Sequence, residues 1–266
     1  MNNLNDHRQI STQNDYNRIM RNNNNPNSYE RDVMEFNPRN TITQDDVNQF
    51  MRGVFGWMFL GLLLTTIASL MFLVALTSVP AIGQNYFVLT ILFVVAQFGL
   101  VITLSAAIHK LSVGTARALY VTYSILSGLT LSSIFMIYSI DSIFLAFAMA
   151  AVFFGIMAVF GYTTQTDLTS AGKIFFAGLI AIIIAMVINI FIGSSQLDFF
   201  ISIGGIAVFA GLTAYDVQKL KTEFYQHAAQ GGPDVIGKVS ILGALRLYLD
   251  MINLFLFLLR ILGRRD

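Results

Sequence analysis

The sequence contains no cysteine, four prolines and one tryptophan among its 266 residues, and only 12% of its residues carry a charge. The lack of cysteine excludes disulfide bonds, thiolate metal sites and cysteine nucleophiles. The three histidines, His7, His109 and His227, lie too far apart in the sequence to form a metal-binding motif. The net charge of +1 gives no electrostatic reason to expect nucleic acid or another polyanion as a partner.

Apolar side chains are what this chain has in excess. Hydrophobic residues make up 55% of it and its mean hydropathy is +0.66. The charged share is about half of the ~25% that is usual in soluble domains. A globule of this length cannot bury so much apolar surface, so the composition predicts an integral, multi-pass membrane protein whose main partner is the lipid bilayer.

Residues 1–48 differ from the rest of the chain. The stretch 20–28 is rich in asparagine and has neither helical nor strand periodicity. We expect residues 1–48 to be a disordered polar tail, because they cannot bury enough surface to offset the entropy of ordering. Residues 43–46 can cap a short helix that leads into the membrane. The tail either docks a partner or is a solvated extension without one, and the second interpretation is favoured.

Long runs without charge predict transmembrane helices. No charged residue occurs from Gly53 to Ile108, which is long enough for two spans of about 20 residues, and turn-forming residues at 77–85 mark the break between them. Five further runs of about bilayer length follow, at Ala118–Ile140, Ser142–Thr166, Ile174–Leu197, Phe199–Tyr215 and Val239–Leu262. We therefore predict an all-α membrane domain of seven transmembrane helices over residues 49–266.

Lysine and arginine alternate between the two sides of this predicted bundle. The tail up to Arg52 holds six arginines, and the loops after the second, fourth and sixth spans all hold lysine, whereas the loops after the first, third and fifth hold neither residue. The positive-inside rule then places the N-terminus in the cytoplasm. Arg264 and Arg265 oppose the pattern if the seventh segment crosses. That segment either crosses fully, which we favour, or re-enters and returns.

Two carboxylates lie within the predicted spans. Asp216 ends the sixth span and Asp250 lies about halfway along the seventh, where an ionisable group costs about 2.5–3.5 kcal/mol on insertion scales and is a functional candidate by default. Adjacent helices can bring the two carboxylates together, and such a pair can share a proton near neutral pH. Alternatively, Asp216 is a boundary residue that interacts with Lys219, and Arg246 neutralises Asp250 one turn away. The spacing alone leaves these interpretations about equally favoured.

The other polar residues in the spans give weaker signals. Gln97, Asn189 and Asn253 are more often interhelical hydrogen-bonding groups than transport residues. The glycines at 204–205 and 211 predict close helix packing rather than a nucleotide-binding loop, because no strand and no Gly-Lys-Ser/Thr motif accompanies them. The spans hold no Ser-His-Asp set and no zinc-binding helix. We therefore predict that the protein is not an enzyme and has no cofactor.

Several longer motifs resemble the Bax inhibitor family of transmembrane proteins, in the order in which that family has them. They are Trp57-Met-Phe-Leu-Gly-Leu, Leu126-Ser-Gly-Leu-Thr-Leu-Ser-Ser, Gly161-Tyr-Thr-Thr-Gln-Thr-Asp-Leu-Thr, Gly211-Leu-Thr-Ala-Tyr-Asp-Val-Gln-Lys, Ala244-Leu-Arg-Leu-Tyr-Leu-Asp-Met-Ile-Asn-Leu-Phe and Leu258-Leu-Arg-Ile-Leu. The resemblance covers about residues 50–266 and leaves the asparagine-rich tail outside.

The resemblance implies a fold and an activity. It implies seven helices with the last surrounded by the other six, and a calcium leak controlled by two aspartates that match Asp216 and Asp250. In bacterial members a basic residue after the second helix pairs with the first of these aspartates. Lys110 is the closest match here, where the family has arginine, whose guanidinium can bind bidentately and an ammonium cannot. The segment between the two aspartates also looks longer here, with an insertion near 226–233, and the second span lacks the glutamate that some members carry.

Three functions remain open at this stage. The favoured one is a pH-sensitive passive calcium leak channel in which Asp216, Asp250 and Lys110 form the ion pathway and pH latch, with calcium and the proton as partners; two carboxylates suit transient calcium binding rather than storage. The alternative is a membrane interaction protein, with the tail as adaptor, that modulates a membrane-bound protease or a stress or cell-death response. A third is a proton-coupled transporter. The resemblance favours the bacterial inner membrane as the location.

Overall fold

The computed structural model describes residues 42–228 and 232–263, and every element within these ranges is a helix. In chain order the helices are α3 (Gln44–Ser78), α4 (Pro80–Gln84), α5 (Tyr86–Ala107), α6 (Val113–Leu131), α7 (Ile134–Ile137), α8 (Ile140–Thr163), α9 (Thr169–Ile192), α10 (Ser195–Ala228) and α11 (Pro233–Leu262). Counting α6 and α7 together, seven of the described segments are long and apolar enough to cross a membrane. The predicted seven-helix architecture is confirmed.

Short polar sequences set the ends of these helices. Ser112 caps α6 by accepting a hydrogen bond from the backbone N–H of Thr115 at 3.0 Å. Pro80 and Pro233 occupy the first turns of α4 and α11, where a missing N–H costs nothing. Gly193 ends α9 in the left-handed conformation, with φ of 67°. The predicted break at 77–85 is therefore a real turn, with α4 inside it.

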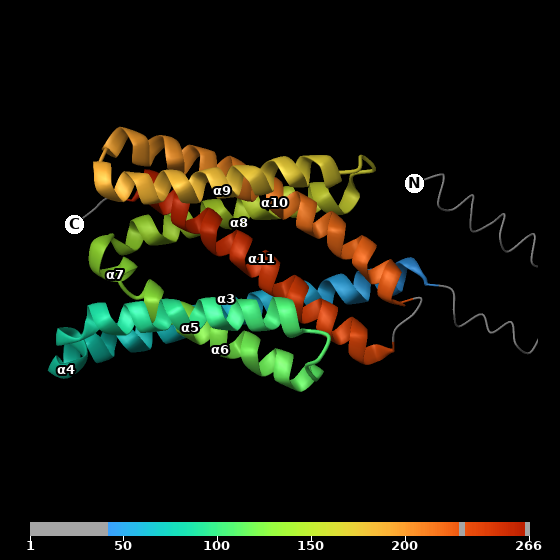
Figure 1. The fold of residues 1–266 in the computed structure, drawn as a ribbon, viewed down its shortest axis with the longest axis horizontal. Coiled ribbons are helices and arrows are strands. Elements are labelled where there is room, and N and C mark those ends of the chain that lie inside the picture. Colours follow the sequence, from blue (N-terminus) through green and yellow to red (C-terminus); the bar gives the residue numbers. More distant parts are fainter. Residues whose placement is uncertain (1–41, 229–231, 264–266) are drawn as a thin grey trace, which may run out of the picture. The chain divides into compact units, whose positions relative to one another are not determined.

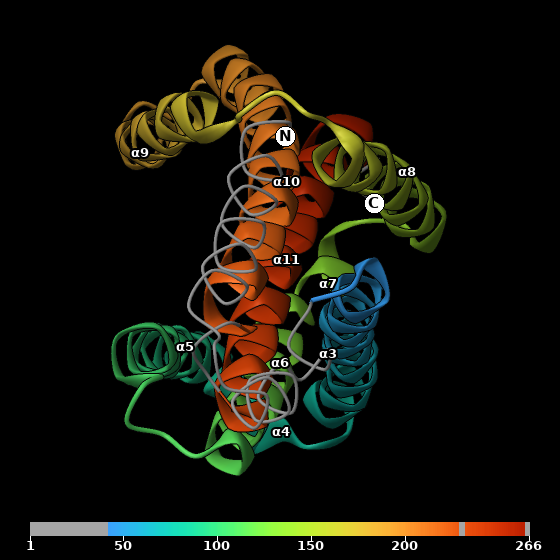
Figure 2. The same ribbon diagram turned by 90° about the vertical axis from the view of Figure 1, so that its right-hand side faces the viewer.

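The last helix lies at the centre of the bundle. α11 packs against α10, α8, α3 and α6, and Figures 1 and 2 show it running between them. Within the 18-residue apolar window of each helix, 67% of the α11 residues are buried, against only 6% for α5 and for α9. The outer helices instead expose apolar side chains such as Phe98 and Phe191. This distribution is the one expected when lipid surrounds the bundle.

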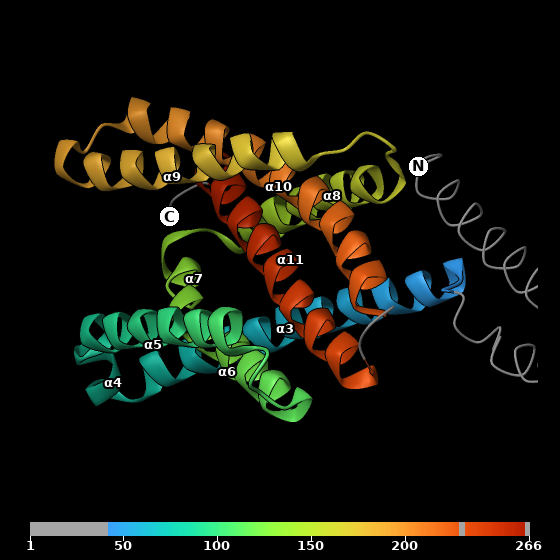
Figure 3. The same cartoon turned by 45° about the vertical axis from the view of Figure 1, so that its right-hand side comes forward.

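The bundle consists of two groups of helices joined through α11. α6 packs on both α3 and α5, while α10 packs on both α8 and α9. Figure 3 shows α5 and α6 on one side of α11 and α9 and α10 on the other. Apart from α11, direct contact between the two groups lies mainly along α3, which touches α10 and whose Gln44 donates to the hydroxyl of Tyr162 on α8 at 2.9 Å. α11 is therefore the main structural link between the groups.

Glycines allow the close helix contacts that the sequence predicts. A Cβ atom on Gly211 of α10 would collide with the ring of Phe175 on α9, and one on Gly205 would lie 2.6 Å from the ring of Phe257 on α11. Because the interiors of helix bundles are closely packed, these positions accept no larger side chain without movement of the neighbouring ring.

Several predicted boundaries differ from the structure. α10 continues through the charged residues after Tyr215 as far as Ala228, so most of the segment predicted as a loop is helical. Residues 44–48 form the first turns of α3, which is one continuous helix rather than a short helix followed by a span. Residues 1–41 of the predicted tail and residues 229–231 of the predicted insertion lie outside the described residues.

An ion pair shows that the last helix crosses the full length of the bundle. Nη1 of Arg260, near the end of α11, lies 3.5 Å from Oδ1 of Asp198, in the first turn of α10. α10 and α11 are consecutive and antiparallel, so this pair lies at the end opposite to the connection between them. Of the two possibilities for the seventh segment, the structure has the full crossing.

Candidate functional site

A cavity of about 830 Å³ lies beside α11. Side chains from α5, α6, α9, α10 and α11 line it, so both groups of helices contribute to its walls. Most of the lining is apolar, with a few polar and charged groups among the aromatic rings, which is the usual composition of a ligand or ion site. Its polar and charged lining residues are Gln97, Tyr123, Lys173, Tyr215, Asp216, Lys219, Arg246, Asp250 and Asn253.

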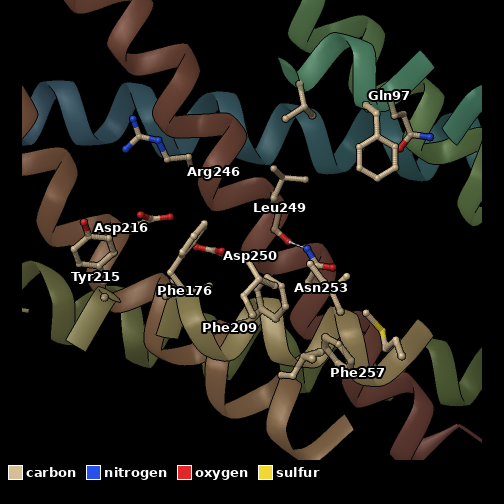
Figure 4. Close-up of a pocket in the computed structure, with 18 of the residues that line it drawn as sticks. Gln97, Phe176, Phe209, Tyr215, Asp216, Arg246, Leu249, Asp250, Asn253 and Phe257 are labelled. Carbon is tan, nitrogen blue, oxygen red and sulfur yellow. Dashed lines mark hydrogen bonds between the residues drawn. The ribbon is translucent and has the colours of Figure 1, made fainter. Parts of the chain in front are cut away.

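The two predicted aspartates face this cavity from adjacent helices. Asp216 comes from α10 and Asp250 from α11, and Figure 4 shows both carboxylates directed into the space beside Phe176. The Asp250 side chain is almost inaccessible, with 5% of the residue exposed, and its Oδ2 atom has no hydrogen-bond partner among the described residues. A buried carboxylate oxygen without a donor is rare in folded proteins and indicates a functional group.

One face of α11 carries a polar row along the cavity. Arg246, Asp250 and Asn253 are spaced by four and three residues, so they lie on the same side of the helix. Nη1 of Arg246 lies 3.0 Å from Oε1 of Glu223 on α10. One of the two alternatives left open by the sequence was that Arg246 neutralises Asp250. The ion pair of Arg246 is with Glu223, and its charge also acts on Asp250.

The loop between α8 and α9 indicates the level of Asp216 along the bundle. Nε2 of Gln218 donates to the backbone oxygen of Thr166 at 2.7 Å, and Oε1 of Gln218 accepts from the N–H of Leu168 at 2.8 Å. Gln218 is therefore level with a loop that joins two spans. Asp216, two residues earlier on α10, lies just to the membrane side of that level. Gly172, in the first turn of α9, contacts the ring of Tyr215 and confirms this alignment.

Cations surround the outer part of the cavity. Nζ of Lys219 lies 5.5 Å from the centre of the Tyr215 ring, and Lys173 of α9 is exposed at the same level. Lys110, which the resemblance assigned to the latch, lies exposed in the turn after α5 and does not line the cavity. Its role in a latch stays a prediction, and Arg246 and Lys219 are the cations whose charges act on Asp216 in this structure.

A buried hydrogen-bond network supports α11 on the side away from the cavity. The hydroxyl groups of Thr65 on α3 and Tyr248 on α11 lie 2.7 Å apart, and Thr65 also donates to the backbone oxygen of Ser124 on α6 at 2.9 Å. The Tyr248 ring packs edge-on against Tyr120 and Tyr123. These contacts fix the rotation of α11 and therefore the direction of Asp250.

The far end of the cavity is closed by aromatic packing. The Phe257 ring lies 5.8 Å from that of Phe209 and fills the space that Gly205 leaves. One turn further along α11, Arg260 makes its ion pair with Asp198. Sδ of Met186, which also lines the cavity, lies 3.7 Å from Nη1 of Arg260, so the cavity ends close to this ion pair.

The site offers few ligands for a resident metal ion. Among residues 42–228 and 232–263, no group of three or more His, Cys, Asp or Glu side chains is placed to hold a metal. Because Ca²⁺ takes six to eight oxygen ligands in tight sites, Asp216 and Asp250 can offer only a weak, transient contact to a cation.

Sequence reasoning missed part of this site. Glu223 was assigned to a loop because a charge run usually marks the end of a span, and only the continuation of α10 brings it to Arg246. Gln97 was interpreted as a packing group, and its Nε2 does lie 3.3 Å from the Thr130 hydroxyl on α6; it also lines the cavity. Its polarity within an apolar span was the available signal.

Comparison with known proteins agrees with this architecture. The family model for "Inhibitor of apoptosis-promoting Bax1" matches residues 47–266. The inner membrane protein YbhL of Escherichia coli is 45% identical over 216 residues, which cover 81% of this chain and 92% of YbhL. An uncharacterized protein of Borreliella burgdorferi is 44% identical over 227 residues, 82% of this chain and 93% of its own length. One of Deinococcus radiodurans is 40% identical over 226 residues, 84% and 94% of the two chains.

These matches cover the described membrane bundle and leave out most of the N-terminal tail, as the sequence resemblance did. The name of the E. coli relative agrees with the predicted inner-membrane location. The motifs, the central α11 and the extent of the family match lead to one conclusion: this chain is a multi-pass membrane protein that belongs to the Bax inhibitor family.

Proposed function

We propose that the protein is a passive calcium leak channel whose flux depends on pH through Asp216 and Asp250. The observation that carries this proposal is the cavity in which the two carboxylates of α10 and α11 face each other inside the bundle. Burial of Asp250 without a donor to its Oδ2 atom from the described part of the chain supports a role beyond folding, since a structural carboxylate is normally hydrogen bonded.

The weak ligand set suits conduction. An ion that passes through must enter a site readily and leave it readily, and two carboxylates supply fewer oxygens than a storage site needs. Oxygen atoms of Asp216 can contact the cation in the outer part of the cavity, and those of Asp250 and Asn253 in its inner part. Arg246 is held by Glu223, so part of its charge is balanced away from the pathway.

The dependence on pH follows from the chemistry of a carboxylate pair. Two negative charges that face one apolar cavity repel each other, and uptake of a proton by either group removes the repulsion. α10 and α11 can then lie side by side without that repulsion. Loss of that proton leaves both carboxylates charged, which favours separation of the helices and attracts Ca²⁺. We therefore expect the calcium flux to fall as the pH falls.

The inner end of the cavity supplies a second barrier. Phe257 blocks the space between Phe209 and Gly205, and the ion pair of Arg260 with Asp198 lies beyond it. Conduction requires this end to open as well, so we assign the described arrangement to a closed form. Rotation of α11 would move Asp250 and Phe257 together, because both lie on the cavity side of that helix.

The test is calcium flux into liposomes that contain the purified full-length chain, measured with an enclosed calcium dye across a range of pH. The wild type is expected to conduct, with a flux that changes with pH. The variant Asp216→Asn with Asp250→Asn is expected to lose the pH dependence. Asp141→Asn is the matched control, because Asp141 is exposed in the first turn of α8 and does not line the cavity.

Two results would contradict the proposal: no calcium flux from the wild type at any pH, or the same pH dependence in the double variant as in the Asp141→Asn control. Accumulation of a solute against its gradient would instead support a proton-coupled transporter. The adaptor hypothesis depends on the tail, whose residues 1–41 lie outside the described structure. It stays a prediction.

A further inference from the structure

The cavity has an open side that faces the surrounding lipid. Phe98 of α5 and Phe176 of α9 both line it, although 66% and 59% of these residues are exposed. α5 packs on α6 and α9 packs on α10, and Figure 2 shows α5 and α9 well apart, both on the same side of α10 and α11. The mouth of the cavity therefore lies between two helices that the bilayer surrounds.

The mouth has an apolar part and a cationic part. Lys173 and Lys219 lie at its outer end, at the level of the loop between α8 and α9, and neither makes an ion pair with a described residue. The apolar lining begins next to them on α9 and continues along that helix as far as Met186. At the rise of an α-helix, the distance from Gly172 to Met186 is about 21 Å, which exceeds the ~15 Å thickness of one hydrocarbon leaflet.

We propose that a membrane phospholipid with an anionic headgroup occupies this mouth. Its phosphate lies between Lys173 and Lys219, and one acyl chain lies in the apolar trough between α5 and α9, against Phe98 and Phe176. The lysines are at the depth where a headgroup lies, because they are level with the loop that ends two spans. The proposal does not rest on calcium conduction, although the mouth belongs to the same cavity as Asp216 and Asp250.

The charges at the mouth favour an anionic headgroup. Of the three cations that line the cavity, Arg246 is paired with Glu223, whereas Lys173 and Lys219 make no ion pair with a described residue. The carboxylates lie deeper than the lysines, since Asp216 precedes Lys219 towards the inside of α10 and Asp250 is nearly inaccessible. A phosphate at the mouth therefore meets the cations first.

The single tryptophan of the chain makes a sensitive test possible. In a Trp57→Phe background, Phe176→Trp places a fluorescent reporter in the mouth. Ile174→Trp is the matched control, because Ile174 lies at nearly the same depth on α9 and is 71% exposed but does not line the cavity. Each full-length protein is reconstituted in phosphatidylcholine vesicles in which a small share of either phosphatidylglycerol or phosphatidylcholine has brominated, fluorescence-quenching chains.

Brominated phosphatidylglycerol is expected to quench the reporter at position 176 well beyond the level at position 174. Two lysines at a membrane surface correspond to roughly a thirtyfold enrichment of the anionic lipid. The excess should disappear in the variant Lys173→Gln with Lys219→Gln, and return when both lysines are replaced by arginine. Brominated phosphatidylcholine should quench both positions equally, and thermal unfolding checks that each variant is folded.

Other outcomes would overturn the proposal. Equal quenching at the two positions by phosphatidylglycerol would mean that the mouth holds no particular lipid. If quenching at position 176 exceeded that at 174 by the same amount for both lipids, the lysines would not select the anionic headgroup. Weaker quenching at position 176 than at 174 with either lipid would mean that another protein surface, such as a second copy of this chain, covers the mouth.

Discussion

Replacement of Asp250 by leucine is expected to make the protein more stable and at the same time abolish its calcium flux. The Asp250 side chain is buried and its Oδ2 atom has no hydrogen-bond donor among the described residues. A buried polar group without a partner costs about 1–3 kcal/mol. Asp250→Leu removes that group, and the adjoining cavity of about 830 Å³ leaves room for the slightly larger side chain.

The expected gain is therefore about 1–3 kcal/mol in the free energy of unfolding, or a rise of roughly 2–12 °C in Tm for a chain of this size. Thermal unfolding in detergent can be followed by the fluorescence of Trp57, which packs against Tyr120 between α3 and α6. Asp141→Leu is the control, because a substitution at an exposed position changes stability by no more than about 0.5 kcal/mol.

A loss of stability in Asp250→Leu would refute this reasoning, because it would mean that the carboxyl group makes favourable contacts in the folded state. No change relative to Asp141→Leu would mean that burial of Asp250 carries no free-energy cost. A gain in stability with unchanged flux would separate the two claims: the physical account of Asp250 would hold, and its role in conduction would not.

Two further predictions test the packing around the site, each by thermal unfolding in detergent. Gly161→Val should destabilise the protein by about 3 kcal/mol, because a Cβ atom at Gly161 collides with the backbone of Ala214 on α10. The control Gly155→Val should change stability little, because a Cβ atom there meets nothing within 4 Å. Equal effects of the two substitutions would contradict the close approach of α8 and α10. Tyr248→Phe should cost about 0.6–1.7 kcal/mol, since it removes the hydrogen bond with Thr65 and keeps the ring; an unchanged Tm would mean that this bond contributes nothing.

The spans and their number could be predicted from the sequence because lipid imposes a simple rule. A helix that crosses the membrane needs a run of about 20 apolar residues, and the uncharged run from Gly53 to Ile108 with a turn at 77–85 became α3, α4 and α5. The position of Asp216 and Asp250 on neighbouring helices followed from their order in the chain. The sequence therefore predicted that the two carboxylates can meet, but not which side chains from α5, α6 and α9 surround them.

The ends of helices could not be predicted by the same rule. The end of an uncharged run marks where the lipid ends. Backbone hydrogen bonds can continue beyond that point, and α10 remains helical as far as Ala228. This continuation brings Glu223 to Arg246, a pairing between helices that local spacing cannot reveal. The spacing of Arg246 and Asp250 suggested a contact within α11 because i, i+4 pairs are neighbours on any helix.

The position of α11 between two groups of helices has a mechanical consequence. Each group is held together by its own contacts, and α11 packs against helices of both. A small rotation of α11 would therefore change its interface with each group at once. A structural change in one group of helices can therefore be transmitted to the other group through a single helix.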